Sequence, residues 1–173
     1  MFVKAAPDFG ADHALQLGVS YINVGNHQED HGDTDEIPTV VELLEGDASV
    51  WGVDAVYKKS PTGSYGQGGV KLQAEYFYLD KELTIEQASD IDEIGEKVVG
   101  QQDGFYIHAV YGVAPRWSLG ARYDVTGMTN DLEEEEKVDL GDSSRMTLAL
   151  TWYPTEFSKF RLQFARADIS KFD

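Results

Sequence analysis

The chain has 173 residues, of which 42% are hydrophobic and 12% aromatic, enough for one ordered domain over residues 1–173. Its 31 Asp and Glu residues outnumber its 14 Lys and Arg residues, and the net charge of -17 excludes a general nucleic-acid binder, because no basic stripe is present to meet phosphates. Cysteine is absent, which excludes disulfides and thiolate metal sites.

Residues 1–12 carry no alternating pattern and are expected to form a turn or a tail. They also lack the long apolar stretch of a signal peptide, so a secretion signal is expected upstream of them. No segment approaches the run of about 18 apolar residues that a transmembrane helix needs. That criterion does not detect membrane β-strands, which are only about 9–11 residues long and half polar.

Seven segments alternate apolar and polar residues with the period of two that is typical of β-strands. The predicted strands cover residues 13–24, 49–58, 69–79, 103–113, 117–125, 145–153 and 160–165. Residues 114–116 predict a short reversal between two of them, because Pro115 has a fixed φ and no backbone N–H for a ladder.

Long acidic connections follow the first, third and fifth predicted strands, at residues 26–47, 80–102 and 126–144. Within the first connection, residues 40–44 are expected to form a short helix or to fold the loop back. Shorter turns rich in Gly, Pro or Ser follow the other strands. Long loops on one side and short turns on the other are typical of outer-membrane barrels, with the long loops extracellular and the short turns periplasmic.

The apolar positions are also sorted along the strands, with aromatic rings at both ends and aliphatic side chains between them. In residues 103–125, Phe105 and Tyr123 stand at one end and Tyr111 and Trp117 at the other. A soluble core gives no reason for this order, whereas a lipid-facing strand places its rings at the two water interfaces. The pattern therefore predicts an all-β fold, an antiparallel transmembrane β-barrel in the bacterial outer membrane.

Residues 145–170 carry Trp152-Tyr153-Pro154 at a turn and Arg166-Ala167-Asp168 at the end of the next strand. This segment resembles the C-terminal region of Gram-negative porins, in particular the phosphate-selective porin O/P family. The resemblance implies a sixteen-stranded barrel, a homotrimer, and passage of small anions or other solutes. Seven is an odd number of strands, so we expect the chain to cover about the last half of a larger barrel.

The polar phase of the predicted strands would face a water-filled lumen. The candidate pore-lining residues are Lys58, Lys71, Glu75, His108, Arg122, Asp124 and Arg161. A reversal at residues 114–116 places His108 opposite Arg122. Such a wall of mixed charge would interact weakly with passing solutes. The alternative is that these side chains only hydrate and brace the lumen.

His27, His31 and Asp33 lie close together in the acidic stretch of residues 26–47. Imidazole and carboxylate groups are ligands for zinc or copper, so these three residues form a candidate metal site. Their spacing matches no rigid metal-binding motif, and a solvated acidic loop is the simpler interpretation. Weak attraction of Ca²⁺ or Mg²⁺ by the acidic loops is a further alternative.

Arg166 falls on the lipid-facing phase, near the outer end of its predicted strand. A charge there costs about 0–1 kcal/mol, compared with about 2–4 kcal/mol in the middle of the bilayer. We expect Arg166 either to contact lipopolysaccharide phosphates or to be turned away from lipid by a bulge.

These patterns predict an outer-membrane porin, or part of one, through which small hydrophilic solutes or ions diffuse passively. Outer-membrane lipid and lipopolysaccharide are the expected partners, and no cofactor is expected. Enzymatic activity is not expected either, because the chain lacks the usual catalytic motifs. The alternatives are a receptor-type barrel for active uptake, a soluble small β-barrel around an apolar ligand, and a small membrane barrel that serves as adhesin or anchor.

Overall fold

The computed structural model describes residues 1–32, 41–88, 91–133 and 137–169. The strands are β1 (Phe2–Ala5), β2 (His13–Gly32), β3 (Val41–Lys59), β4 (Val70–Gln87), β5 (Lys97–Ala114), β6 (Trp117–Glu133), β7 (Lys137–Asp139), β8 (Ser143–Thr155) and β9 (Ser158–Asp168). All belong to one antiparallel sheet, and no α-helix occurs in the described residues. The predicted all-β antiparallel fold is confirmed.

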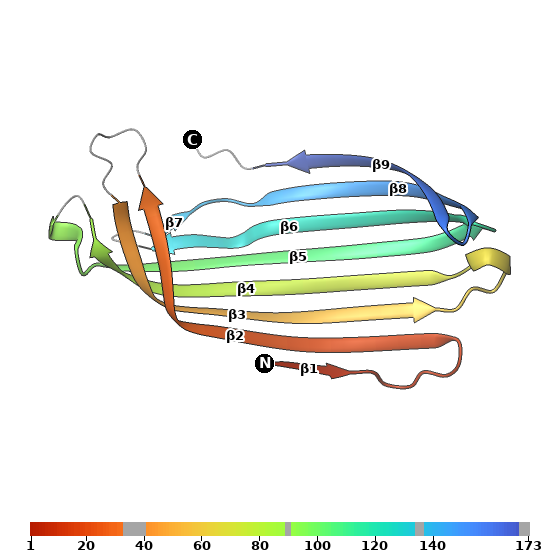
Figure 1. Ribbon diagram of the computed structural model, residues 1–173, viewed down its shortest axis with the longest axis horizontal. Coiled ribbons are helices and arrows are strands. Elements are labelled where there is room, and N and C mark those ends of the chain that lie inside the picture. The colour runs from red at the N-terminus through yellow and green to blue at the C-terminus, as the bar shows by residue number, and fades with distance from the viewer. Residues whose placement is uncertain (33–40, 89–90, 134–136, 170–173) are drawn as a thin grey trace.

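Eight strands lie side by side in chain order, from β1 to β6 and then β8 and β9, while the short β7 pairs with β6 (Figure 1). Short connections gather at one end of the sheet, which we call the turn end. The connection between β3 and β4 there contains the 3-10 turn η1 (Ser64–Gly66). The opposite end, the hairpin end, holds the far ends of β2 to β7 and the 3-10 turn η2 (Ile91–Glu93).

The expectation that residues 1–12 form only a turn or tail is wrong. Residues 2–5 form β1, which pairs with β2 from Phe2 opposite Ser20 to Ala5 opposite Leu17. The backbone of Met1 continues the ladder, because its carbonyl accepts a hydrogen bond of 2.9 Å from the Tyr21 N–H. Pairing with β2 holds this strand, which is too short to show an alternating pattern of its own.

The predicted long loops are wrong over most of their length, because the strands continue into them. β2 and β3 pair as far as Gly32 opposite Val41, and β4 and β5 as far as Thr84 opposite Lys97. Ladder hydrogen bonds join backbone groups, so charged side chains do not end a strand that projects into water. Residues 41–44 belong to β3, which excludes the short helix there; residue 40 lies outside the described residues.

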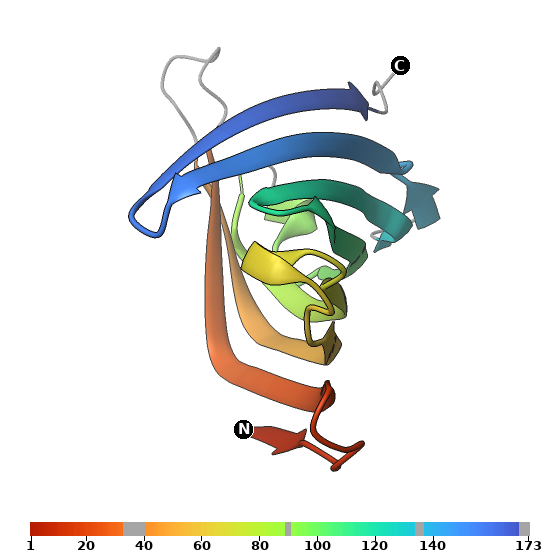
Figure 2. The same ribbon diagram turned by 90° about the vertical axis from the view of Figure 1, so that its right-hand side faces the viewer.

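The sheet is open. β1 and β9 form its two edges and do not pair with each other in the described residues. Figure 2, with the turn end facing the viewer, shows the sheet twisted and curled, with β1 and β9 far apart. The predicted closure into a barrel is therefore not formed by these strands alone.

Few side chains of the described residues are buried, and the main cluster lies at the hairpin end. Leu44, Leu83, Ile85 and Val98 are 2–6% exposed and pack together, with Ala88 and Leu132 against them in part. This cluster holds the strand extensions together where the backbone leaves the regular sheet. The long central parts of the strands have no comparable core.

Arg116 joins three connections at the turn end. Its guanidinium lies 4.3 Å above the Tyr65 ring and donates a hydrogen bond to the Pro154 carbonyl. Its backbone N–H donates to the Tyr65 carbonyl at 3.1 Å, and its own carbonyl accepts from the Tyr153 N–H at 2.9 Å. Arg116 has a φ of 68°, a left-handed conformation that non-glycine residues adopt rarely. These contacts fix the ends of β5, β6 and β8 relative to one another.

Candidate functional site

The sheet has one polar and one apolar face. Alternate residues of each strand point to opposite sides, and the register places polar residues opposite polar ones and apolar residues opposite apolar ones. One row across β3, β4, β5, β6 and β8 consists of Asp54, Glu75, Tyr106, Asp124 and Arg145. The neighbouring row, on the other side, consists of Ala55, Ala74, Ile107, Tyr123 and Met146. We call these sides the polar face and the apolar face.

All seven predicted pore-lining residues lie on the polar face. A hollow of about 850 Å³ on this face is lined by Lys71, His108, Arg122, Asp124 and Arg161. Lys58, on β3, lies directly opposite Lys71, on β4, and both line a second hollow of about 500 Å³ at the turn end. The predicted pairing of His108 with Arg122 is confirmed by the register of β5 and β6. That this face lines a pore stays a prediction.

A hydrogen-bonded network braces the middle of the polar face. Gln73 donates to the Tyr106 hydroxyl at 2.7 Å, and that hydroxyl donates to Glu75 at 2.6 Å. The Arg122 guanidinium lies 3.8 Å from the centre of the Tyr106 ring and is paired with Asp124 at 2.6 Å. Stacking and pairing together hold Arg122 in one orientation, which leaves a rigid charged wall in place of mobile side chains.

The larger hollow is electropositive. Lys71, Arg122, Arg145 and Arg161 line it together with a single carboxylate, Asp124, so four positive charges face one negative charge and three remain. Arg161 donates a hydrogen bond of 3.1 Å to Thr151, whose side chain is buried. Arg145 was missed among the candidate residues, although the apolar positions Met146 and Leu148 of the same strand already imply that it points to the polar face.

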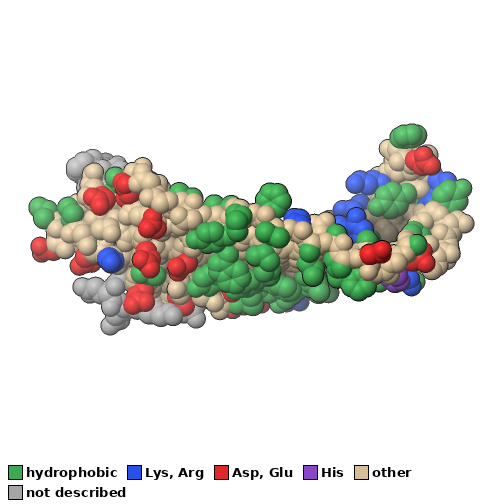
Figure 3. All heavy atoms as spheres, turned by 90° about the horizontal axis from the view of Figure 1, so that it is seen from below, with side chains coloured by type: hydrophobic (Ala, Val, Ile, Leu, Met, Phe, Trp, Pro, Cys, Tyr) green, Lys and Arg blue, Asp and Glu red, His purple; other side chains and the backbone are tan. Residues whose placement is uncertain are grey.

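The apolar face is exposed across the whole width of the sheet. Among its large hydrophobic side chains, Leu119 is 50% exposed and Leu162 is 76% exposed, and no described residue covers them. Figure 3 shows hydrophobic side chains gathered over the middle of the molecule, acidic ones at the hairpin end, and Lys and Arg at the turn end. A contiguous exposed apolar surface of this size marks a site of contact with a partner or a membrane.

Two belts of mostly aromatic residues border the apolar face, and a constant interval separates them. The turn-end belt consists of Tyr57, Tyr111, Trp117, Trp152 and Phe160. The hairpin-end belt lies six positions away on the same strands and consists of Trp51, Phe105, Tyr123, Met146 and Arg166. The rings of Trp117 and Trp152 stack at 5.7 Å, and those of Trp152 and Phe160 at 5.8 Å.

The belts run obliquely to the hydrogen-bonded rows of the sheet. Trp51 lies opposite Tyr78, whereas Phe105 lies opposite Tyr76. Phe105 therefore belongs to the next row of the apolar face, two residues closer to the turn end along each strand. Tyr123 lies a further step in the same direction, opposite Ile107. Strands that are tilted relative to a flat boundary produce this stepwise displacement, because a level line then crosses successive strands at different residues.

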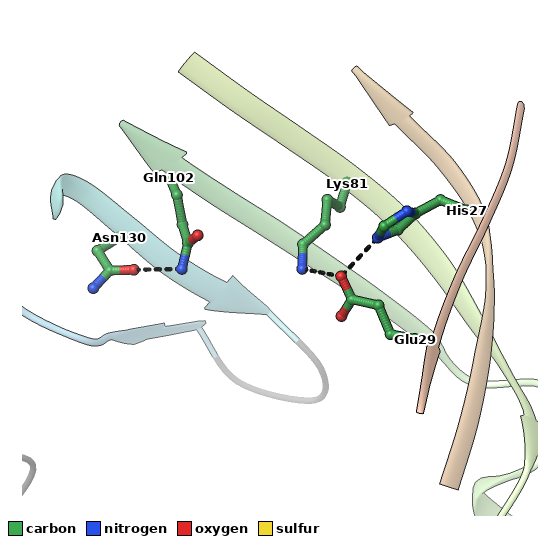
Figure 4. Close-up of polar contacts among 5 residues, drawn as sticks. All are labelled: His27, Glu29, Lys81, Gln102 and Asn130. Carbon is green, nitrogen blue, oxygen red and sulfur yellow. Dashed lines mark hydrogen bonds and ion pairs between the residues drawn. The ribbon is translucent and has the colours of Figure 1, made fainter. Parts of the chain in front are cut away.

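An ion triad crosses the sheet at the hairpin end. The Glu29 carboxylate, on β2, accepts a hydrogen bond of 2.5 Å from Lys81, on β4, and is 2.8 Å from the His27 ring nitrogen (Figure 4). Partial burial raises the pKa of Glu29, but hydrogen bonds and charge from Lys81 and His27 outweigh burial and lower that pKa from 4.5 to about 2. Glu29 is therefore ionised at neutral pH and ties β2 to β4.

The predicted metal site is not assembled in the described residues. His27 contacts Glu29, while Asp33 and the side chain of His31 lie outside the described part of the chain. No group of three or more potential metal ligands converges among the residues that the structure describes. Metal binding through His31 and Asp33 stays a prediction.

No protein family, curated protein or solved structure matches the chain. Among the described residues, no helix is long and apolar enough to cross a membrane. Function is therefore inferred from the two faces, their belts and their charges.

Proposed function

We propose that this sheet is part of the wall of an outer-membrane β-barrel, and that its polar face lines an aqueous pore for passive diffusion of small hydrophilic solutes or ions. The observation that carries the proposal is the exposed apolar face between two belts six positions apart. Aromatic belts with aliphatic side chains between them match the two interfaces and the hydrocarbon interior of a membrane.

Lipid contact accounts for the exposure of the apolar face. Burial of apolar surface is worth about 25 cal/mol per Å², so a face that carries Leu119, Leu150, Leu162 and Phe164 in water would be costly and prone to association. The same side chains in a hydrocarbon layer need no protein partner. The oblique course of the belts further supports this placement, because barrel strands are tilted by about 35–45°.

The proposal requires more strands than the described residues supply. The outer edges of β1 and β9 carry unpaired backbone groups, which lipid cannot satisfy at a cost of several kcal/mol each. Further strands, including those of other copies of the chain, must therefore pair with both edges in the membrane. Because β1 runs towards the turn end and β9 away from it, antiparallel neighbours can continue the sheet at either edge.

The proposed mechanism is diffusion along a hydrated, charged wall. A solute passes the acidic hairpin end and then the electropositive hollow of Lys71, Arg145 and Arg161. Charges of both signs attract and release ions at successive places along the path, so that binding stays weak enough for passage. The rigid network around Arg122 keeps the wall open instead of letting long side chains collapse into the lumen.

Refolding of the full chain tests the membrane placement. The chain is diluted from denaturant into plain buffer or into detergent micelles, and secondary structure and particle size are measured by circular dichroism and sizing. We expect aggregation in buffer and β-structure in micelles. A β-rich monomer in plain buffer would contradict the proposal, because the apolar face would then be covered by the protein itself. Ion conductance across a planar bilayer then tests the pore.

A further inference from the structure

We infer that the apolar face carries a binding site for a phosphate-bearing lipid, with Arg166 at the phosphate and an adjacent apolar groove along the acyl chain. The inference rests on the proposed membrane placement and adds a specific ligand to it.

Arg166 occupies a belt position that three other strands give to an aromatic ring and β8 gives to Met146. On β3, β5 and β6 this position holds Trp51, Phe105 and Tyr123, and on β9 it holds Arg166, six positions from Phe160. Belt residues lie at the level of the lipid headgroups. A guanidinium at this level lies where lipid phosphates are, and its cost there is about 0–1 kcal/mol.

The guanidinium of Arg166 is exposed and forms no hydrogen bond or ion pair with any residue that the structure describes. Arg122, by contrast, is paired with Asp124, and Arg116 donates to the Pro154 carbonyl. Arg166 therefore keeps all its donors for an external ligand. The planar fork of a guanidinium matches two phosphate oxygens at once, which makes phosphate a better ligand than a single carbonyl or hydroxyl.

A groove of about 640 Å³ lies on the apolar face and reaches β9 at Leu162 and Phe164. Ala109 and Ala121 pair across β5 and β6 in its middle, and larger side chains surround them. These larger lining residues include Leu72, Tyr111, Leu119, Leu148, Leu162 and Phe164. Phe164 is two positions from Arg166 on the same face of β9, about 7 Å along the strand. The groove volume is within the range of about 300–1,000 Å³ that small-molecule sites have.

Charge complementarity selects the occupant. No charged residue lines the groove, and the nearest cation along β9 is Arg166, two positions beyond the lining residue Phe164. This arrangement fits a molecule with a hydrocarbon tail and one anionic head. Asp168 lies two positions beyond Arg166 on the same face, so an anion is repelled from the outer side. The phosphate is therefore expected between Arg166 and the groove. Free phosphate has no tail with which to fill the groove.

Lipid binding by the full chain in neutral detergent micelles tests the inference. The probes are dioleoyl phosphatidic acid and dioleoyl glycerol, which share their acyl chains and differ in the phosphate. Native mass spectrometry measures the bound fraction of each. We expect phosphatidic acid to bind about tenfold more tightly, and R166Q to remove this preference. The matched control is K159Q, which removes a charge from the opposite face of β9 and should leave the preference intact.

Two further variants test the groove and the side of Arg166 on which the phosphate binds. A121F fills the middle of the groove and is expected to weaken binding of both lipids, whereas D168N is expected to strengthen phosphatidic acid binding. The inference is overturned if R166Q and K159Q behave alike, if A121F binds as the unaltered chain does, or if millimolar inorganic phosphate displaces the lipid. A chain that fails to enter micelles overturns the proposed function as well, whereas insertion without lipid preference overturns only the lipid site.

Discussion

Replacing Leu119 with Arg is expected to destabilise the chain in a bilayer by about 2–4 kcal/mol, because the new cation lies between the two belts. Trp117 and Tyr123 are six positions apart on β6, about 20 Å along the strand. A strand tilt of about 40° reduces the separation of the belts to about 15 Å along the membrane normal. Leu119 then lies about 5 Å inside the Trp117 belt and about 3 Å from the midplane.

Gly120→Arg is the matched control for this substitution. Gly120 neighbours Leu119 at nearly the same depth but points to the polar face, where it lines the larger hollow. A Cβ atom at Gly120 would meet its nearest neighbours at 3.8 Å, an ordinary contact, so an added side chain fits. We expect the control to change stability by no more than about 0.5 kcal/mol, the usual range for surface positions.

The free energy of unfolding of both variants can be measured by urea titration of the full chain in phosphatidylcholine vesicles, followed by Trp fluorescence. Leu119 is 50% exposed in the sheet, so in water its replacement removes little buried surface. A loss confined to Leu119→Arg supports lipid contact on the apolar face. Equal stability of the two variants would refute the assignment of the faces.

Three further predictions follow from single contacts. Lowering the pH from about 4.5 towards 2 should remove up to about 3 kcal/mol from the hairpin end. The lowered pKa of Glu29 contributes its full stabilisation above the ordinary pKa, and this stabilisation is lost as the pH falls to the lowered pKa. Amide hydrogen exchange of β2 and β4 measures this loss, which Glu29→Gln should abolish. Arg116→Ala should cost about 1–2 kcal/mol through its lost stacking and hydrogen bonds, and a urea midpoint equal to that of Lys159→Ala contradicts this. Arg161→Gln should shift the reversal potential of bilayer conductance towards cations, whereas Arg166→Gln, on the other face of the same strand, should not.

The central strands could be predicted from the sequence because their signal is local. In a regularly alternating strand, such as residues 117–125, the apolar and polar positions show directly which side chains share a face. The pairing of His108 with Arg122 was predicted from a reversal at residues 114–116, but the structure reaches it differently. Ala114 belongs to β5 and pairs with Trp117, and a register shift between Gly112 and Ala114 restores the predicted pairing.

The strand extensions at the hairpin end were not predictable in the same way. Residues 80–87 and 97–102 mix charged and apolar side chains and have turn-like composition around them, so alternation gives no clear signal. Their pairing depends on the ladder that enters from the regular sheet and on the buried cluster around Leu83. β1 is likewise held by its neighbour and not by its own pattern.

Contacts between distant segments escaped prediction for a different reason. Lys81 and Glu29 are 52 positions apart, and neither belongs to a sequence motif that would predict their contact. The Arg116 contacts at the turn end depend on a left-handed backbone conformation that nothing in the local sequence requires, since residue 116 is not a glycine. The belts, in contrast, could be seen in the sequence, but their oblique course needed the register.

The central claim, that the apolar face meets lipid and the polar face meets water, is tested most directly by spin labels along β6. The chain contains no cysteine, so single cysteines at positions 118 to 122 can each be labelled without a background. Collision rates with oxygen, which concentrates in lipid, and with a water-soluble nickel chelate are measured in vesicles. We predict higher oxygen accessibility at 119 and 121 and higher nickel accessibility at 118, 120 and 122. Reversed or absent alternation would contradict the account.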